Sequence, residues 1–401
     1  MFQFEITFTA LKQSIHIYYP IIFFCLSCFT VKASDSITIK LLVQRIAAMQ
    51  AISDGNIPKG SFASYRTYHL NKHRQKADIN AFYTGLICFT LRDLENQFDG
   101  IEKQQVNNII NQAKPYFNKF KNQKGRNTYN FWTTDTSRIF PNSGLLNAFN
   151  KSQALPDDFD DTVILLMAMN ATDSVAKAIH RLMQDYTNQS KKKINNTFKQ
   201  YQDIPAYSTW FGKKMPIDFD VSVLMNVLYF VQKYQLPFSK ADSASVDLIV
   251  KVIESNQYET TASYVSPHYN TTAVILYHLS RLMALKPIPA IEQYKSQLIL
   301  SAKNCYTHSN SFLEKIILST TLMRWGIDMP TMVITAQSNL IELIEEDDYP
   351  FFIANIASML TNPFKKIASS TGLVKFTYHS PAYNQLLLLE NLVWQQKRQT
   401  K

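Results

Sequence analysis

The strongest constraint on the fold of this chain is a set of stretches that carry no charge on any side. They are Ala81–Leu91, Thr162–Thr172, Val221–Val231 and Thr271–Leu279, the last interrupted only by His278. Helices of this composition have to be buried all round. Between them lie one-sided stretches with apolar residues at i, i+3, i+4 and i+7, which start at Ile39, Val106, Val175 and Val246. These predict helices with one face on a core and one in water.

Alternation of the two helix types predicts an all-α fold. The buried stretches follow Asn80, Asp160, Asp220 and Asn270, so the unit repeats at about 50 to 60 residues in its later part. Helices buried on every side fit a closed array better than an open one. We therefore expect residues 34–401 to form one α/α toroid, a double ring of about six helical hairpins. Ser311–Trp325 and Tyr349–Leu360 are the candidate helices for the later units.

No segment alternates apolar and polar residues over a useful length, so no strands are expected. Glycine is scarce, at 9 of 401 residues. Folds built on tight turns or Gly-rich phosphate loops use far more glycine, which disfavours β-sandwiches and dinucleotide-binding enzymes.

Residues 1–33 predict a secretory signal peptide. An apolar run ends near Val31, and small residues precede a cleavage site after Ala33. The mature chain is then exported, either periplasmic or at the cell surface. An uncleaved anchor or a lipid on Cys28 are the alternatives. Cleavage leaves only Cys88 and Cys305, which is too few for a disulfide scaffold.

The formal net charge of +10 is scattered along the chain. Its densest run, residues 191–193, is three lysines without an accompanying nucleic-acid motif. We interpret this charge as one that keeps the protein soluble and causes some attraction to surfaces. We expect no nucleic-acid partner, while a membrane surface and the oligomeric state remain open.

One cluster of acidic residues stands out. Asp158, Asp160 and Asp161 lie together at the start of one buried stretch, and Asp218 and Asp220 precede the next. In a toroid these helix starts meet at one end. Asp residues there are ordinary helix caps, so a purely structural role is one interpretation. Crowded carboxylates also repel one another, which raises a pKa and suits a general acid.

Other residues of the same helix starts and entry loops are candidates for binding. His268 takes the place of the first Asp in the fourth unit, with Tyr269 after it. Aromatic side chains would line a cavity, and Arg66 would bind an anionic group or pair with an aspartate. The aromatic candidates are Tyr83, Phe131, Trp132, Trp210 and Tyr269.

The run Asp158-Phe159-Asp160-Asp161 is followed by Thr162. It resembles the Asp-x-Asp-Asp motif of class II terpenoid cyclases, members of the terpenoid cyclase and protein prenyltransferase superfamily. The resemblance implies an α/α toroid in which Asp160 protonates an alkene or epoxide, with Asp158 and Asp161 tuning its acidity.

Zinc, which the prenyltransferase branch of that superfamily uses, is not expected here. Cys305 and His308 form a two-ligand pair without a third partner. We therefore expect neither a metal nor another cofactor.

Two other functions remain open from the sequence. Carboxylates with aromatic platforms also serve glycan cleavage or glycan binding. A toroid that lost its chemistry would be a binding or scaffold protein. The chain lacks the Gly-x-Ser-x-Gly, Walker A, Gly-x-Gly-x-x-Gly and His-Glu-x-x-His motifs, so those enzyme classes find no support.

Overall fold

The computed structural model describes residues 38–139, 155–190, 192–212, 215–330, 341–347, 349–371 and 375–400. This part of the chain is mostly helical, as predicted, and also contains a small sheet that the sequence did not predict. The signal peptide predicted for residues 1–33, with its cleavage site after Ala33, lies outside the described residues. None of the described helices combines the length and the apolar character that crossing a bilayer requires.

The four uncharged stretches all form buried helices, and two further helices join them. Their side chains are buried along most of the helix, or along the first half in the case of the last one. We call these six the inner helices: α2 (Phe82–Asp93), α5 (Phe159–Ala168), α7 (Val221–Lys233), α11 (Thr272–Leu285), α14 (Phe312–Arg324) and α17 (Pro381–Gln399).

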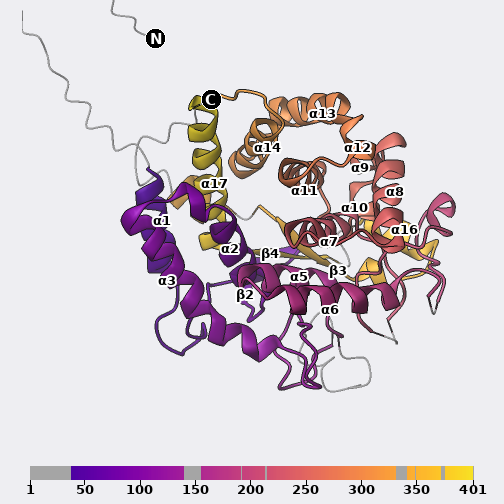
Figure 1. Ribbon diagram of the computed structural model, residues 1–401, viewed down its shortest axis with the longest axis horizontal. Coiled ribbons are helices and arrows are strands. Elements are labelled where there is room, and N and C mark those ends of the chain that lie inside the picture. Colours follow the sequence, from indigo (N-terminus) through magenta and orange to yellow (C-terminus); the bar gives the residue numbers. More distant parts are fainter. Residues whose placement is uncertain are drawn as a thin grey trace, which may run out of the picture. The chain divides into compact units, whose positions relative to one another are not determined.

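The inner helices pack on one another in chain order. Helix α2 packs against α5, α5 against α7, α7 against α11, α11 against α14, and α14 against α17. Helix α17 in turn packs against α2, so the contacts return to the helix from which they start. Figure 1 shows the six helices around the middle of the view. Closing the contacts in this way gives every inner helix two inner neighbours, which explains the long uncharged stretches of α2, α5, α7 and α11.

The four one-sided stretches form outer helices, as predicted, and α13 is a fifth outer helix that the pattern did not predict. These are α1 (Ile39–Met49), α3 (Gly100–Phe117), α6 (Asp173–Met183), α8 (Lys240–Glu254) and α13 (Lys295–His308). Helix α1 packs on α17, α3 on α2, α8 on α7, and α13 on both α11 and α14. Helix α6 is tied to α8 by a 2.8 Å hydrogen bond from His180 Nε2 to Asp242 Oδ2.

Short helices fill the connections. The α-helical ones are α9 (Gln257–Thr260), α10 (Ala262–Val265), α12 (Pro289–Glu292) and α16 (Phe364–Ser369). The 3₁₀ turns are η1 (Glu95–Gln97), η2 (Asn118–Phe120), η4 (Gln184–Tyr186), η5 (Lys199–Tyr201) and η7 (Ile356–Met359), and η6 (Ile341–Glu345) is a π-helix.

A four-stranded antiparallel sheet joins the two ends of the described chain. Its strands are β1 (Tyr65–Tyr68), β2 (Asn71–Ala77), β3 (Phe352–Asn355) and β4 (Lys375–His379), in the order β2-β1-β4-β3. Strand β1 pairs with β4 in the register Tyr65 to His379. In Figure 1 the strands cross the middle of the view, among the inner helices.

The prediction of a helix over Tyr349–Leu360 is wrong. This segment forms β3 and the 3₁₀ turn η7 instead. Phe351, Phe352 and Ile353 favour a strand, and their β-sheet partners come from β4. Pairing of this kind depends on tertiary structure, which a local apolar pattern does not reveal.

The sequence predicts that an Asp or Asn side chain caps each of the four buried helices, and this holds at two of them. Asp158 caps α5 by accepting from Asp161 N at 2.7 Å, and Asp220 caps α7 by accepting from Ser222 N at 2.9 Å. Helix α2 begins after Ala81, and Thr271 caps α11 in place of Asn270. Asp160 therefore lies inside the first turn of α5 and is not its cap.

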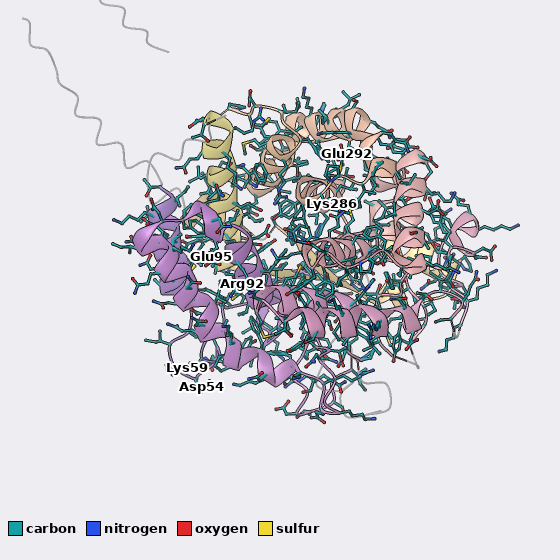
Figure 2. The ribbon with its side chains drawn as sticks, in the orientation of Figure 1. Asp54, Lys59, Arg92, Glu95, Lys286 and Glu292 are labelled. Carbon is teal, nitrogen blue, oxygen red and sulfur yellow. The ribbon has the colours of Figure 1, made fainter. Side chains whose placement is uncertain are left out.

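The other ends of the inner helices are tied by side chains, as at Arg92. Its Nε donates to Ala168 O at 2.7 Å and so links the C-terminal ends of α2 and α5. Arg92 also pairs with Glu95 at 3.7 Å, and both are labelled in Figure 2. Figure 2 further shows side chains occupying the space among the inner helices.

A buried ion pair holds α16 against the core. Lys365 Nζ lies 2.8 Å from Asp218 Oδ1, and the two side chains are 1% and 0% exposed. Asn196 Nδ2 also donates to this carboxylate, at 3.3 Å. Two charges this deep are tolerable only while both are present.

We expect Lys365→Met to lower the free energy of unfolding by about 3–5 kcal/mol, because it leaves the Asp218 carboxylate buried without its countercharge. The double variant Asp218→Leu/Lys365→Met should recover most of that loss, since it buries no charge. Denaturant unfolding followed by circular dichroism measures both. Equal losses in the single and the double variant would contradict this account of the pair.

Candidate functional site

A small cavity lies where the inner helices begin. The first residues of α2, α5 and α7 reach it, together with the segment before α11 and strand β3. Its lining is mainly apolar apart from three carboxyl groups, one hydroxyl and one imidazole. We call it the acidic cavity, and its lining residues are Phe82, Phe131, Leu155, Asp158, Asp160, Asp161, Thr209, Trp210, Val223, His268, Phe352 and Ala354.

Entry loops bring these residues together. Single β-bridges link Asn80 to Trp132, Tyr129 to Asp158, and Asp158 to Trp210. The loops before α2, α5 and α7 are thereby held side by side. This agrees with the expectation that the aromatic entry loops gather at the N-terminal ends of the buried helices.

Asp160 has a hydrogen-bond donor on each oxygen. Asn226 Nδ2 of α7 donates to Oδ1 at 2.6 Å, and the Tyr269 hydroxyl donates to Oδ2. Asp160 is 6% exposed, and burial raises its pKa to about 6, although these two hydrogen bonds act in the opposite direction. A carboxyl group of this kind changes protonation near neutral pH, as a general acid should.

Asp158 and Asp161 form a coupled pair beside it. Burial, followed by the charge of Asp161 and a hydrogen bond with it, raises the pKa of Asp158 well above its ordinary value. Burial raises the pKa of Asp161 to about 7, with the Asp158 hydrogen bond acting against it. Two buried carboxyl groups with raised pKa values favour a proton on one of them as the pH approaches neutral.

His268 is oriented from both sides. Its backbone N donates to Asp220 Oδ2 at 2.8 Å, and its Nδ1 lies 3.2 Å from Ile353 O of β3. Because a carbonyl only accepts, Nδ1 carries the hydrogen, and a neutral ring presents Nε2 as an acceptor. Among the described residues, neither His268 Nε2 nor Asp161 Oδ1 has a hydrogen-bond partner, although both atoms are buried. Each lines the acidic cavity with a polar atom left to bind something.

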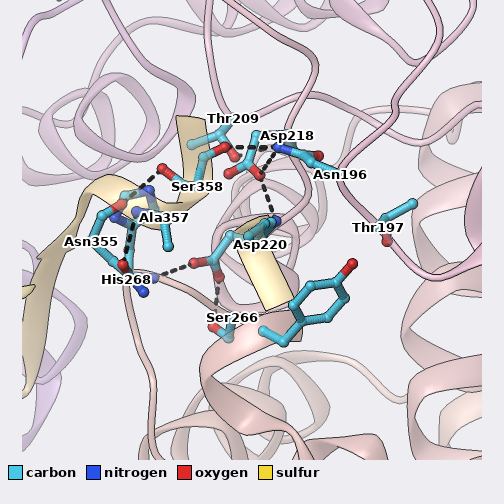
Figure 3. Close-up of polar contacts among 12 residues, drawn as sticks. Asn196, Thr197, Thr209, Asp218, Asp220, Ser266, His268, Asn355, Ala357 and Ser358 are labelled. Carbon is cyan, nitrogen blue, oxygen red and sulfur yellow. Dashed lines mark hydrogen bonds and ion pairs between the residues drawn. The ribbon is translucent and has the colours of Figure 1, made fainter. Parts of the chain in front are cut away.

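Asp218 and Asp220 turn out to have separate tasks. Asp220 caps α7 and accepts from Ser266 Oγ at 2.6 Å as well as from His268 N, so it supports the cavity wall. Asp218 faces Lys365 and Asn196 instead and does not line the cavity. Figure 3 shows the two carboxylates close together but directed at different partners.

Three other predicted site residues support the structure around the cavity without lining it. Trp132 Nε1 donates to Asp78 Oδ1 at 3.0 Å, and Arg66 Nη1 lies 3.6 Å from Asp78 Oδ2. The Tyr83 hydroxyl donates to Tyr378 O at 2.6 Å. Each of the three ties the loops or strands to one another. Of the predicted site residues, Asp158, Asp160, Asp161, Trp210 and His268 meet in the cavity, and Tyr269 lies directly behind Asp160.

Sequence reasoning missed Asn226, Arg281 and Phe352. Asn226 is the one amide within the apolar run of α7, and it holds Asp160. Arg281 donates through Nη2 to Asn226 Oδ1. A polar residue inside a helix that is buried on all sides needs a partner, so both were detectable signals. Phe352 was hidden by the wrong helix prediction for its segment.

Strand β3 places the Phe352 ring among the helix starts. The Phe352 ring lies 4.2 Å from the Phe82 ring and stacks with Phe131 at 5.5 Å and with His268 at 6.0 Å. The cavity that remains leaves about 40 Å³ to the centres of water-sized molecules, enough for a few waters.

Within the described part of the chain, no three His, Cys, Asp or Glu side chains are grouped so as to hold a metal ion. The Cys305–His308 pair lies on α13, away from the acidic cavity. Comparison of the chain with protein-family models, curated proteins and solved structures finds no match.

The raised pKa of Asp160 predicts a pH dependence of stability. Folding favours the protonated carboxyl, so its stabilisation is present at low pH and disappears as the pH rises from about 4 through about 6. Relative to Asp160→Asn, the wild type should lose on the order of 2–3 kcal/mol across that range. The Asp158–Asp161 pair titrates in both proteins, but the charge of Asp160 raises both of its pKa values, so the difference also contains this coupling. Chemical unfolding at a series of pH values measures it, and a pH-independent difference would contradict the assignment.

Proposed function

We propose that the inner and outer helices form an α/α toroid, and that the acidic cavity is the active site of a general-acid enzyme that resembles class II terpenoid cyclases. The architecture is supported by the inner-helix contacts, which return from α17 to α2, and by the outer helices packed on them. The helix starts that would form one end of the ring are those that meet at the acidic cavity.

The observation that carries the function is the state of Asp160. It lines an apolar, aromatic cavity, it is not a helix cap, and its pKa of about 6 lets it hold a proton near neutral pH. A scaffold protein would need Asp160 only as a cap, and Asp158 already performs that task.

In the proposed reaction, protonated Asp160 donates its proton to one carbon of an alkene, and the π electrons form the new C–H bond. The resulting cation lies among Phe82, Phe131, Phe352 and Trp210, whose rings stabilise positive charge. The π electrons of a second double bond of the substrate then attack this cation, which closes the ring and moves the positive charge to a new carbon. His268 Nε2 takes a proton from a neighbouring carbon, and the electrons of that C–H bond re-form a double bond. One proton enters and one leaves, so the product is an isomer of the substrate.

The lining favours an uncharged substrate. No lysine or arginine lines the cavity among the described residues, whereas three carboxyl groups do. An anionic diphosphate would be repelled, and a sugar would find few polar partners on these walls. An uncharged isoprenoid alkene or epoxide is therefore the best match. Such a substrate exceeds the present cavity and would have to displace the Phe352 ring.

Because residues 1–33 predict a signal peptide, we propose that the protein is exported and is either periplasmic or at the cell surface. A membrane would be the source of a lipid substrate there. Glycan binding or cleavage in the same cavity is the alternative, and recovery of a bound oligosaccharide would favour it.

We expect Asp160→Asn to lower turnover by a factor of about 10²–10⁴, because it removes the transferable proton. The test incubates wild type and variant in D₂O with uncharged polyprenyl alkenes and follows deuterated cyclic isomers by mass spectrometry. Asp157→Asn is the matched control: this neighbouring carboxylate bonds Thr128 and Arg126 outside the cavity lining. Equal deuterium incorporation by Asp160→Asn and wild type would overturn the proposal.

Phe352→Ala should enlarge the acidic cavity at a cost in stability of about 3–5 kcal/mol. Because empty apolar cavities accept small apolar molecules, the variant should bind benzene or xenon that wild type does not. Phe98→Ala is the control, since Phe98 is a buried core residue outside the cavity lining. Both variants open an apolar cavity, so ligand NMR has to locate the ligand: contacts with Phe131 and Trp210 are expected in Phe352→Ala and not in Phe98→Ala. A ligand that does not contact these residues in Phe352→Ala would show that Phe352 does not fill the site.

A further inference from the structure

Asn226 uses both ends of its amide inside the core. It is 1% exposed on helix α7, where its neighbours in the chain are apolar. Its Nδ2 donates to Asp160 Oδ1 at 2.6 Å, and its Oδ1 accepts from Arg281 Nη2. Three inner helices, α5, α7 and α11, are thereby joined in one buried chain of hydrogen bonds.

Arg281 fixes which way this amide points. A guanidinium group can donate but cannot accept, so the oxygen of Asn226 has to face Arg281. The NH₂ group then has to face Asp160. Flipping the amide would set two donors against each other at Arg281 and two acceptors against each other at Asp160.

This orientation decides where Asp160 carries its proton. An amide NH₂ only donates, so Asp160 Oδ1 has to remain an acceptor. On the other side, the Tyr269 hydroxyl bonds Oδ2 and can either donate or accept. Oδ2 is therefore the oxygen that can be protonated without losing a hydrogen bond.

Arg281 also carries a positive charge, and the Asn226 amide separates it from the Asp160 carboxyl group. Its guanidinium lies over the rings of Phe89, Tyr229 and Tyr277, at 5.0, 5.6 and 5.6 Å from their centroids. Its Nη1 is buried without a hydrogen-bond partner among the described residues. Direct contact with Asp160 would lower the pKa of the carboxyl group well below its present value of about 6, so that no significant fraction would stay protonated near neutral pH. The interposed amide prevents that contact.

We propose that Arg281 and Asn226 are positioning residues for Asp160: together they direct its proton to Oδ2, and Asn226 keeps the Arg281 charge close enough to acidify the carboxyl group but too far to ionise it permanently. The catalytic meaning of this arrangement rests on the proposed function. The arrangement itself rests on the hydrogen bonds alone.

Other charged and titratable groups also act on Asp160 and have to be held constant. They come from the start of its own helix and from the segments before α7 and α11: Asp158, Asp161, Asp220, His268 and Tyr269.

The experiment compares Arg281→Gln with Arg281→Lys. The glutamine amide can still donate to Asn226 but carries no charge, whereas lysine keeps the charge without the planar fork. The Asp160 carboxyl band is followed by infrared spectroscopy against pH, and subtraction of the Asp160→Asn spectrum identifies it. We expect Arg281→Gln to raise the Asp160 pKa by about one unit or more, a tenfold change in proton affinity. Arg281→Lys should stay within about half a unit of wild type.

Arg92→Gln is the matched control. Arg92 is bonded to the last residue of α5, and Asp160 lies in the first turn of that helix. An unchanged Asp160 pKa is expected there. If Arg281→Gln titrated as wild type does, or if Arg281→Lys shifted the pKa as far as Arg281→Gln, the proposal would be wrong.

Asn226→Ala is the second variant, should Arg281→Gln not fold. It removes the donor to Oδ1 while Arg281 stays held over the rings of Phe89, Tyr229 and Tyr277, so the Asp160 pKa should rise by about one unit. An unchanged pKa would overturn the role of Asn226. The titrations need no substrate, so they stand or fall separately from the deuterium experiment. If the Asp160 pKa shifted as expected but no deuterated isomer formed, only the proposed function would be rejected.

Discussion

Helices that are apolar on every side have to bury one another, and most of this structure follows from that constraint. The four helices with uncharged stretches satisfy it together with α14 and α17, by packing in a circuit from α2 to α17 and back to α2. The space that they enclose also has to be filled, because unfilled volume costs stability. Different side chains fill this enclosed space at the N-terminal and at the C-terminal ends of the inner helices.

At the C-terminal ends, charged side chains fill the interior. Arg324 bonds Glu390, and its guanidinium lies 4.5 Å from the Tyr277 centroid. Arg281 lies over the same ring. The aromatic faces that could receive a ligand cation in this half are thus already occupied by the protein's own cations. At the N-terminal ends, by contrast, Phe352 of β3 packs among the aromatic rings of the acidic cavity, and buried polar atoms of His268 and Asp161 lack partners among the described residues.

The sequence was a good guide to helices and a poor guide to what lies between them. Burial of α2, α5, α7 and α11 follows from composition, which does not depend on the rest of the chain. Strand β3 could not be found in the same way, because its partners lie in β4 and around His268. Among the acidic residues, Asp158 and Asp218 are equivalent by pattern. Only tertiary packing sets Asp218 against Lys365, from a segment far along the chain.

Three carboxyl groups within four residues perform three tasks because of helix geometry. Asp158 is extended at the N-cap, so its side chain turns back onto the backbone of the first turn. Asp160 and Asp161 follow in that turn, about 100° apart around the helix axis. One direction leads to Asn226 of the neighbouring inner helix, and the other leads back to Asp158. The result is one buried acid, Asp160, beside a pair of carboxyl groups whose pKa values are also raised. A run of solvated aspartates could not behave in this way, because water would screen each carboxyl group from the next.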